Sequence, residues 1–301
     1  MAHGARPHRG ASLSLSRGEL ALLLVLVVLT AGAWALTIHQ ARTMDMPMGV
    51  VVRGAGQNAP SAPGDLGMAM PPATSMGEMA ASGMSGMGWS WDAFLTFLLA
   101  WSVMMAAMMF PAAAPMILLF HKVAARGQVT GRAFAPTWLF TAGYLLVWIG
   151  IGAATWAAIQ LASDLAGRLG VAARDTWAPL ALGAILIAAG LYQFTPLKAV
   201  CLRHCQSPMG FVMTHWREGR IGALRMGVAH GAYCLGCCWM LFAVLVAAGV
   251  MSLAWMLVLT LVVFAEKVLP LGSRAVAATG IALICLGLVV AMGAATFPWS
   301  A

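Results

Sequence analysis

Residues 230–239 read His-Gly-Ala-Tyr-Cys-Leu-Gly-Cys-Cys-Trp and lie inside an apolar run from about Gly222 to Gly249. The stretch holds His230 and three of the six cysteines, Cys234, Cys237 and Cys238. On a helix, His230, Cys234 and Cys237 fall within roughly 60° of one another, and Cys238 sits about 40° beyond Cys234. The pattern predicts a membrane-spanning helix that carries imidazole and thiols on one face.

This combination of ligands favours Cu(I), zinc or an iron–sulfur centre over calcium or magnesium. The alternative is that the cysteines act as small hydrophobic residues, while Gly231 and Gly236 allow close helix packing. Polar and ionisable groups at bilayer depth are costly and tend to mark functional sites. We therefore favour a metal site, with Cu(I) as the preferred ion and zinc as the second.

The composition is that of a membrane protein. Of 301 residues, 61% are hydrophobic and 9% are charged, and the mean hydropathy is +0.87. A span needs about 20 apolar residues. The predicted fold is all-α, a polytopic transmembrane helix bundle of about seven spans, at residues 20–38, 91–120, 135–161, 178–194, 222–249, 253–268 and 275–292. The net charge of +8 is dispersed among loops, so it does not indicate nucleic-acid binding.

The apolar runs divide the chain into three regions. Residues 1–38 form an N-terminal tail and a first transmembrane anchor; its apolar run is longer than that of a usual signal peptide, so an anchor is favoured over a cleaved leader. Residues 39–90 form a linker rich in Gly, Pro, Ala and Ser, which is expected to be disordered. Residues 91–295 form a six-helix transmembrane metal-binding domain.

The linker contains nine methionines: Met44, Met46, Met48, Met68, Met70, Met76, Met79, Met84 and Met87. Thioethers are soft ligands, so the linker is a candidate Cu(I) collector. The alternative is a low-complexity spacer of biased composition.

The second span contains Met104, Met105, Met108 and Met109. Met104 and Met108, like Met105 and Met109, are one helical turn apart, which predicts two adjacent thioether stripes. Such stripes are also ordinary core packing. Pro111 and Pro115 follow, and they are expected to break or kink the helix.

Residues 195–225 are expected to form a basic loop. It contains Cys201 and Cys205, a Cys-x3-Cys pair with His204 between them. The pair is compact enough for one metal ion or for a disulfide, but it lacks the repeated Cys-x2-Cys of structural zinc sites.

The basic residues also predict topology. With the N-terminus inside, all of the 17 lysines and arginines except Arg42, Arg53, Arg168 and Arg174 fall in cytoplasmic segments. By the positive-inside rule this places the N-terminus and Cys201/Cys205 in the cytoplasm and the Met-rich linker outside.

The chain resembles a family of bacterial inner-membrane proteins catalogued as predicted metal-binding integral membrane proteins. The resemblance is carried by Ala100–Pro111, Lys198–Pro208, Gly227–Trp239 and Glu266-Lys267, and it covers residues 91–295. It implies a metal-binding role in a multi-pass protein of the bacterial inner membrane. The first span and the linker lie outside it.

We expect a protein that binds Cu(I) for transport or for delivery to a partner, either a copper enzyme or a chaperone. In this scheme the linker collects the ion, the four methionines of the second span pass it to His230 and the Cys234 face, and Cys201/Cys205 receive it inside. Two alternatives are a membrane thiol–disulfide oxidoreductase that uses Cys234/Cys237 or Cys201/Cys205, and a scaffold whose cysteines only pack. An enzyme is the less favoured class.

Glu266 and Lys267 are adjacent charges near a membrane boundary. Lys267 is expected to snorkel to the cytoplasmic interface, whereas the shorter Glu266 would face the bundle. Glu266 would then balance a bound cation or take part in proton exchange; the alternative is a simple interfacial anchor.

Overall fold

The computed structural model describes residues 16–43, 90–131, 133–167, 171–249, 253–269 and 272–292. Every secondary-structure element in these ranges is a helix, so the all-α prediction is confirmed for them. The helices are α1 (Arg17–Thr43), α3 (Trp91–Val129), α4 (Thr137–Gly167), α5 (Val171–Tyr192), α6 (Pro196–Gln206), α7 (Pro208–His215), α8 (Gly219–Gly249), α9 (Leu253–Val268) and α10 (Gly272–Ala291). The nine linker methionines lie outside the described residues.

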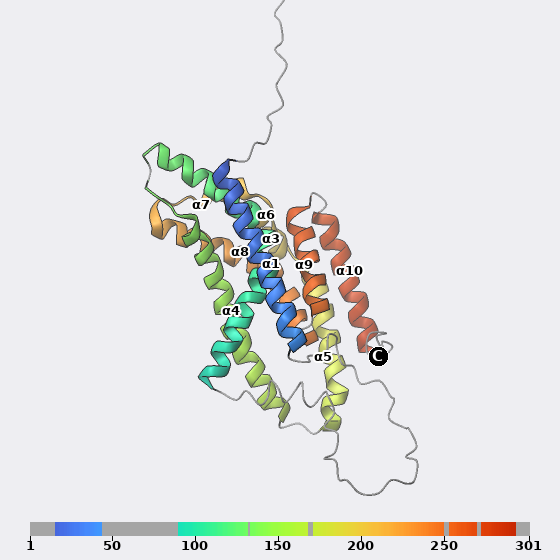
Figure 1. Ribbon diagram of the computed structural model, residues 1–301. Coiled ribbons are helices and arrows are strands. Elements are labelled where there is room, and N and C mark those ends of the chain that lie inside the picture. Colours follow the sequence, from blue (N-terminus) through green and yellow to red (C-terminus); the bar gives the residue numbers. More distant parts are fainter. Residues whose placement is uncertain are drawn as a thin grey trace, which may run out of the picture.

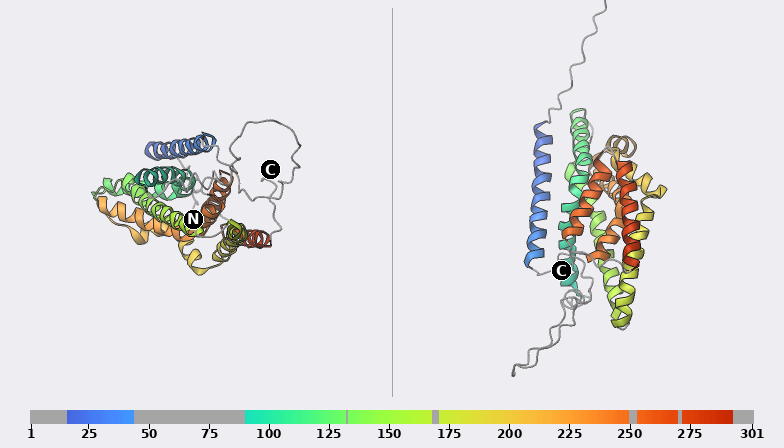
Figure 2. Two further views of the ribbon diagram at one scale, coloured as in Figure 1. Left: turned by 90° about the horizontal axis from the view of Figure 1, so that it is seen from below. Right: turned by 90° about the vertical axis from the view of Figure 1, so that its right-hand side faces the viewer.

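The long helices run side by side as a bundle (Figure 1). Helix α8 packs against α4 on one side and against α5, α6 and α9 on the other, while α5 pairs with α10. Helix α1 lies at one edge, against α3 (Figure 2). The helix that carries the His/Cys stretch is therefore central, and the short α6 lies against it.

Five of the described helices are long and apolar enough to cross a membrane: α1, α3, α4, α8 and α10. A sixth span results if Leu180–Tyr192 and Pro196–Gln206, which are bent by 65° at the break between them, are taken together. Helix α9 has only 16 residues, fewer than the roughly 20 that a hydrocarbon layer requires. The predicted count of about seven spans is thus not confirmed.

The region expected to be a basic loop is largely helical. Pro196 starts α6 and Pro208 starts α7, and the Thr195 side chain caps α6 by accepting from the backbone N–H of Lys198. Proline suits the first turn of a helix because the N–H that it lacks has no intrahelical partner there. Helix α3 continues through Pro111 and Pro115, so of the two expected alternatives, a break or a kink, the break is wrong.

Glycines set the close contact between α4 and α8. A Cβ atom at Gly227 would overlap the backbone carbonyl of Phe140, and one at Gly143 would overlap that of Leu224. Each helix therefore offers a glycine to the backbone of the other. This is the small-residue packing by which helices approach closely in membranes.

A buried ion pair joins α6 to α9. Lys198 Nζ lies 2.7 Å from Glu266 Oε2, and the two side chains are 1% and 3% exposed. Gln206, at the other end of α6, donates from Nε2 to the backbone carbonyl of Glu266 at 2.6 Å. Lys198 was expected among the surface charges of the loop, and this is wrong; it fixes α6 in place instead.

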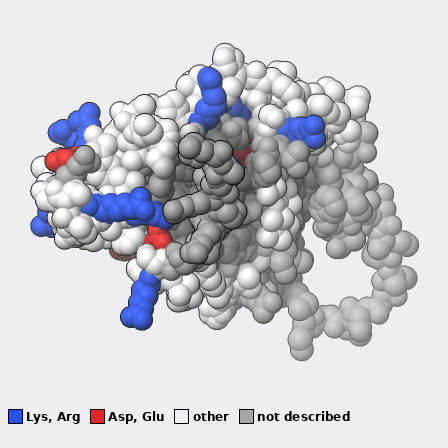
Figure 3. Space-filling view, turned by 90° about the horizontal axis from the view of Figure 1, so that it is seen from above, with Lys and Arg blue, Asp and Glu red and all other residues white. Residues whose placement is uncertain are grey.

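Other basic side chains, unlike Lys198, lie at the protein surface. Lys and Arg side chains are spread over the end of the bundle at which α1 begins and α3 ends (Figure 3). Arg203, Arg217 and Arg220 are exposed, as expected for residues that would set topology.

The glycine contact predicts a specific packing defect. Gly227→Ala should destabilise the protein by roughly 1–3 kcal/mol, because the new methyl group overpacks against the Phe140 carbonyl. Gly150→Ala on α4 is the matched control; nothing lies within 4 Å of a Cβ there, so the helix should gain up to about 1 kcal/mol. Unfolding in mixed detergent micelles measures both. Equal stability of the two variants would contradict the packing model.

The ion pair predicts a second, larger defect. Lys198→Met should cost roughly 3–5 kcal/mol, because it leaves Glu266 buried without its partner. The double variant Lys198→Met/Glu266→Gln should recover most of this loss, since it removes both charges. The same unfolding measurement tests it, and a Lys198→Met variant as stable as the wild type would rule out a structural ion pair.

Candidate metal centre

The His/Cys face of α8 lies in the protein interior. Cys234, Cys237 and Cys238 are 2%, 1% and 1% exposed. The sulfurs of Cys237 and Cys238 lie 3.0 and 2.8 Å from the backbone carbonyl of Cys234, to which they donate. Helix α8 is continuous through Gly236, so Cys238 keeps its helical position. Local unwinding at Gly236, which would have turned Cys238 toward the other two cysteines, is not found.

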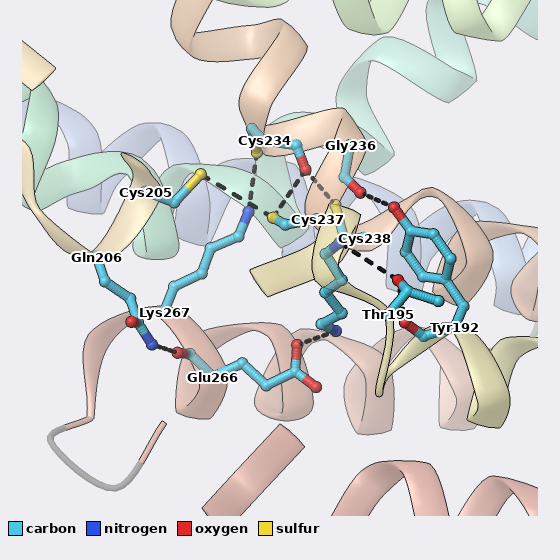
Figure 4. Close-up of polar contacts among 11 residues, drawn as sticks. Tyr192, Thr195, Cys205, Gln206, Cys234, Gly236, Cys237, Cys238, Glu266 and Lys267 are labelled. Carbon is cyan, nitrogen blue, oxygen red and sulfur yellow. Dashed lines mark hydrogen bonds and ion pairs between the residues drawn. The ribbon is translucent and has the colours of Figure 1, made fainter. Parts of the chain in front are cut away.

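Gly236 lets α6 approach this face. A Cβ atom at position 236 would lie 2.7 Å from the sulfur of Cys201. The Tyr192 hydroxyl, at the end of α5, donates to the backbone carbonyl of Gly236 (Figure 4). The absence of a side chain at Gly236 thus leaves room for the sulfur of Cys201.

The approach of α6 unites the two groups of cysteines. Cys205 Sγ lies 4.0 Å from Cys237 Sγ, and both are free thiols. Metal–thiolate bonds of about 2.3 Å allow two sulfurs on one ion to lie up to about 4.6 Å apart, so this separation fits a shared soft ion. The sequence scheme placed Cys201 and Cys205 apart, as a receiving pair at the cytoplasmic end. The structure instead joins them to the α8 face.

Lys267 enters the same cluster from α9. Its ammonium Nζ lies 2.9 Å from Cys234 Sγ, and Figure 4 shows its side chain pointing toward the cysteines. The expected snorkelling to the interface is wrong, since Lys267 is only 8% exposed. An ammonium can only donate, so the sulfur of Cys234 is the acceptor. The Tyr144 hydroxyl, from α4, lies 3.1 Å from the same sulfur.

Glu266 faces the bundle interior, as one of the two sequence-based readings expected. It is 2% exposed and is held by Lys198. Its second carboxylate oxygen, Oε1, has no hydrogen-bond partner among the described residues. The reading as a simple interfacial anchor does not fit a carboxylate so deeply buried.

His230 lies one helical turn before Cys234 and is 3% exposed. Its ring stacks on Phe140 and Tyr144, with centroids 5.9 and 5.6 Å away. Within the described chain, Nδ1 has no hydrogen-bond partner. Because a buried polar atom without a partner is costly, this nitrogen is available to a ligand.

The methionine stripes form part of the hydrophobic core. Met104, Met105, Met108 and Met109 are at most 2% exposed, and they lie on α3, which contributes no cysteine to the cluster. Helix α3 packs against α9. The sixth cysteine, Cys285, lies exposed on α10 and outside the cluster.

No group of three or more His, Cys, Asp or Glu side chains in the described ranges is arranged so that it could hold a metal ion. Two sulfurs of the α8 face are turned back to the carbonyl of Cys234, and an ammonium lies beside the third. Between α6 and α8, the sulfurs of Cys205 and Cys237 lie 4.0 Å apart. This arrangement suits an ion that accepts two thiolates better than one that needs four ligands.

Sequence reasoning missed the polar residues around the sulfurs. Tyr144 was not singled out, Lys198 and Tyr192 were not assigned to the site, and Lys267 was placed at the interface. One signal was present, because a charged pair at the end of an apolar run is itself a mark of a site. The partners of these residues lie far away along the chain, so spacing alone could not identify them.

The comparisons with known proteins bear on the same region. No curated protein and no solved structure matches the chain. A family model described as PpoB2, copper chaperone, matches residues 98–290. The match includes the cysteine cluster, Lys198 and Glu266-Lys267, and it agrees with the metal-related family that the sequence motifs indicated. The chain therefore belongs to the PpoB2 family of copper chaperones.

Proposed function

We propose that the protein binds Cu(I) within the membrane and delivers it to a copper enzyme or to another chaperone. The observation that carries the proposal is the approach of Cys205 to Cys237, at 4.0 Å between two helices, in a chain of the copper chaperone family. Cys205 and Cys237 would form the primary pair. Cys201, Cys234, Cys238 and His230 lie next to it as exchange ligands.

The choice of ion follows from softness and ligand number. Thiolates select soft ions such as Cu(I), and Cu(I) is stable with two of them. Structural zinc is almost always bound by four ligands, and no group of three or more candidate side chains converges in the described part of the chain. Zinc is therefore the weaker candidate.

We propose that the methionines serve the same ion at other stages. The linker would collect it, and the Met104–Met109 stripes would lie on its route, since α3 packs against the helix that carries Lys267. A packing role for the stripes needs no metal, and their deep burial supports that role as well. The cysteine cluster is the part of the proposal with the strongest geometric support.

A thiol–disulfide oxidoreductase would use the same Cys205/Cys237 pair. The two sulfurs would have to close to about 2.05 Å to form a disulfide, and a protein thiol would then have to reach them. Cys237 is 1% exposed, whereas redox-active cysteines are accessible to solvent. Burial favours metal binding over thiol exchange.

The primary pair predicts a graded mutational series. Cys205→Ser and Cys237→Ser should each weaken Cu(I) binding by more than about 100-fold, because loss of a ligand should exceed the cost of losing an outer-shell partner. Cys285→Ser, remote and exposed, is the control and should bind as the wild type does. Competition with a chromophoric Cu(I) chelator, on detergent-purified protein under reducing conditions, measures the affinity.

The same series separates the alternatives. An oxidoreductase would show a disulfide between Cys205 and Cys237 after mild oxidation and no stoichiometric copper. Wild-type copper affinity in both serine variants would end the metal-site proposal.

We propose a bacterial inner-membrane location with the N-terminus in the cytoplasm, on the strength of the positive-inside count. An epitope tag at the N-terminus should be protected in intact spheroplasts, whereas a tag inserted after Ser61 should be accessible to antibody. Permeabilised cells provide the control for tag detection. The reverse pattern of protection would invert the model.

A further inference from the structure

Lys267 is a buried charge whose partner is a sulfur atom. Of the buried charged side chains that the structure describes, Glu19 pairs with Lys122 and Glu266 pairs with Lys198. The ammonium of Lys267 donates to Cys234 Sγ at 2.9 Å. Its positive charge also acts on Cys205, Cys237 and Cys238.

The helices that contribute polar side chains to the cluster offer this charge no carboxylate of its own. Helix α4 contributes the neutral phenol of Tyr144, and α6 contributes Cys201, Cys205 and Lys198, the last already paired. Helix α8 contributes His230 and its cysteines, and α9 contributes Glu266, which Lys198 holds. The Lys198–Glu266 pair is neutral overall, so the cluster carries one net positive charge from Lys267 before the sulfurs are counted.

We infer that Lys267 is the fixed counter-charge that makes this cluster selective for a monovalent soft ion over a divalent one. The inference rests on the proposed copper-binding function. Two thiolates with one Cu(I) ion carry a net charge of minus one, which the ammonium of Lys267 cancels. Two thiolates with a divalent ion are already neutral, and the same ammonium then leaves an excess positive charge. The site is therefore electroneutral only with a monovalent ion.

The burial of the cluster makes this difference matter. An unbalanced charge costs little at a hydrated surface, but it is expensive in an apolar interior. Lys267 need not move when metal binds to Cys205 and Cys237, because it donates to the sulfur of Cys234, which lies outside that pair. Softness would thus exclude calcium and magnesium, and the charge on Lys267 would favour Cu(I) over soft divalent ions.

The test compares two soft ions of different charge on the same protein. Affinities for Cu(I) and for Cd(II) are measured by chelator competition on the full chain in detergent under reducing conditions. Lys267→Met removes the charge and keeps much of the apolar stem, and Lys267→Gln removes the charge but keeps a hydrogen-bond donor. Lys267→Arg keeps the charge and is the matched control.

Both neutral variants should bind Cu(I) at least about tenfold more weakly and should change the affinity for Cd(II) much less, since a unit charge a few ångströms away stabilises the anionic Cu(I) complex and has little net effect on the neutral Cd(II) complex. Lys267→Arg should keep the preference for Cu(I). A purely structural role for Lys267 would weaken both ions together, and this result, or an unchanged ratio of affinities, would overturn the inference. Absence of Cu(I) binding by the wild type would instead reject the proposed function, and the inference with it.

Discussion

Burial of charge next to sulfur is the constraint on which the arrangement of the short helices depends. An ammonium inside an apolar bundle requires an acceptor, and Lys267 finds one in the sulfur of Cys234. A carboxylate one residue earlier requires its own cation, and Lys198 of α6 provides it. Helices α6, α8 and α9 are thus tied together by polar contacts that cannot be exchanged for water. The cysteines are brought together as a consequence.

The helical architecture could be predicted because it depends on local properties of the chain. Long apolar runs specify helices that bury their own backbone polar groups, and their positions agree with α1, α3, α4, α8 and α10. The face shared by His230, Cys234 and Cys237 could also be predicted, since helical geometry fixes it without knowledge of any partner. The inward direction of Glu266 followed from the short reach of its side chain.

The rest depended on contacts between distant residues. Lys198 and Glu266 are 68 positions apart, and Cys205 and Cys237 are 32 positions apart. Spacing carries no information about such pairs. The 195–225 segment looked like a loop because its helices are short and basic residues are scattered along it, and Lys198 looked like a surface charge for the same reason. The methionines of α3 show a second limit of spacing. A regular row of methionines has the same spacing whether the side chains pack in the core or bind a metal ion.

The unequal exposure of Cys205 and Cys237 bears on how a shared metal ion would be exchanged. Cys205 is partly exposed, whereas Cys237 is almost fully buried. An ion shared by these sulfurs could be approached from the Cys205 side only, so an acceptor would replace one thiolate while the other still held the metal. Exchange of this kind passes through a mixed complex of donor and acceptor. Under the proposed function, copper would leave by substitution at Cys205, without an interval as a free ion, and the acceptor would set the rate of release.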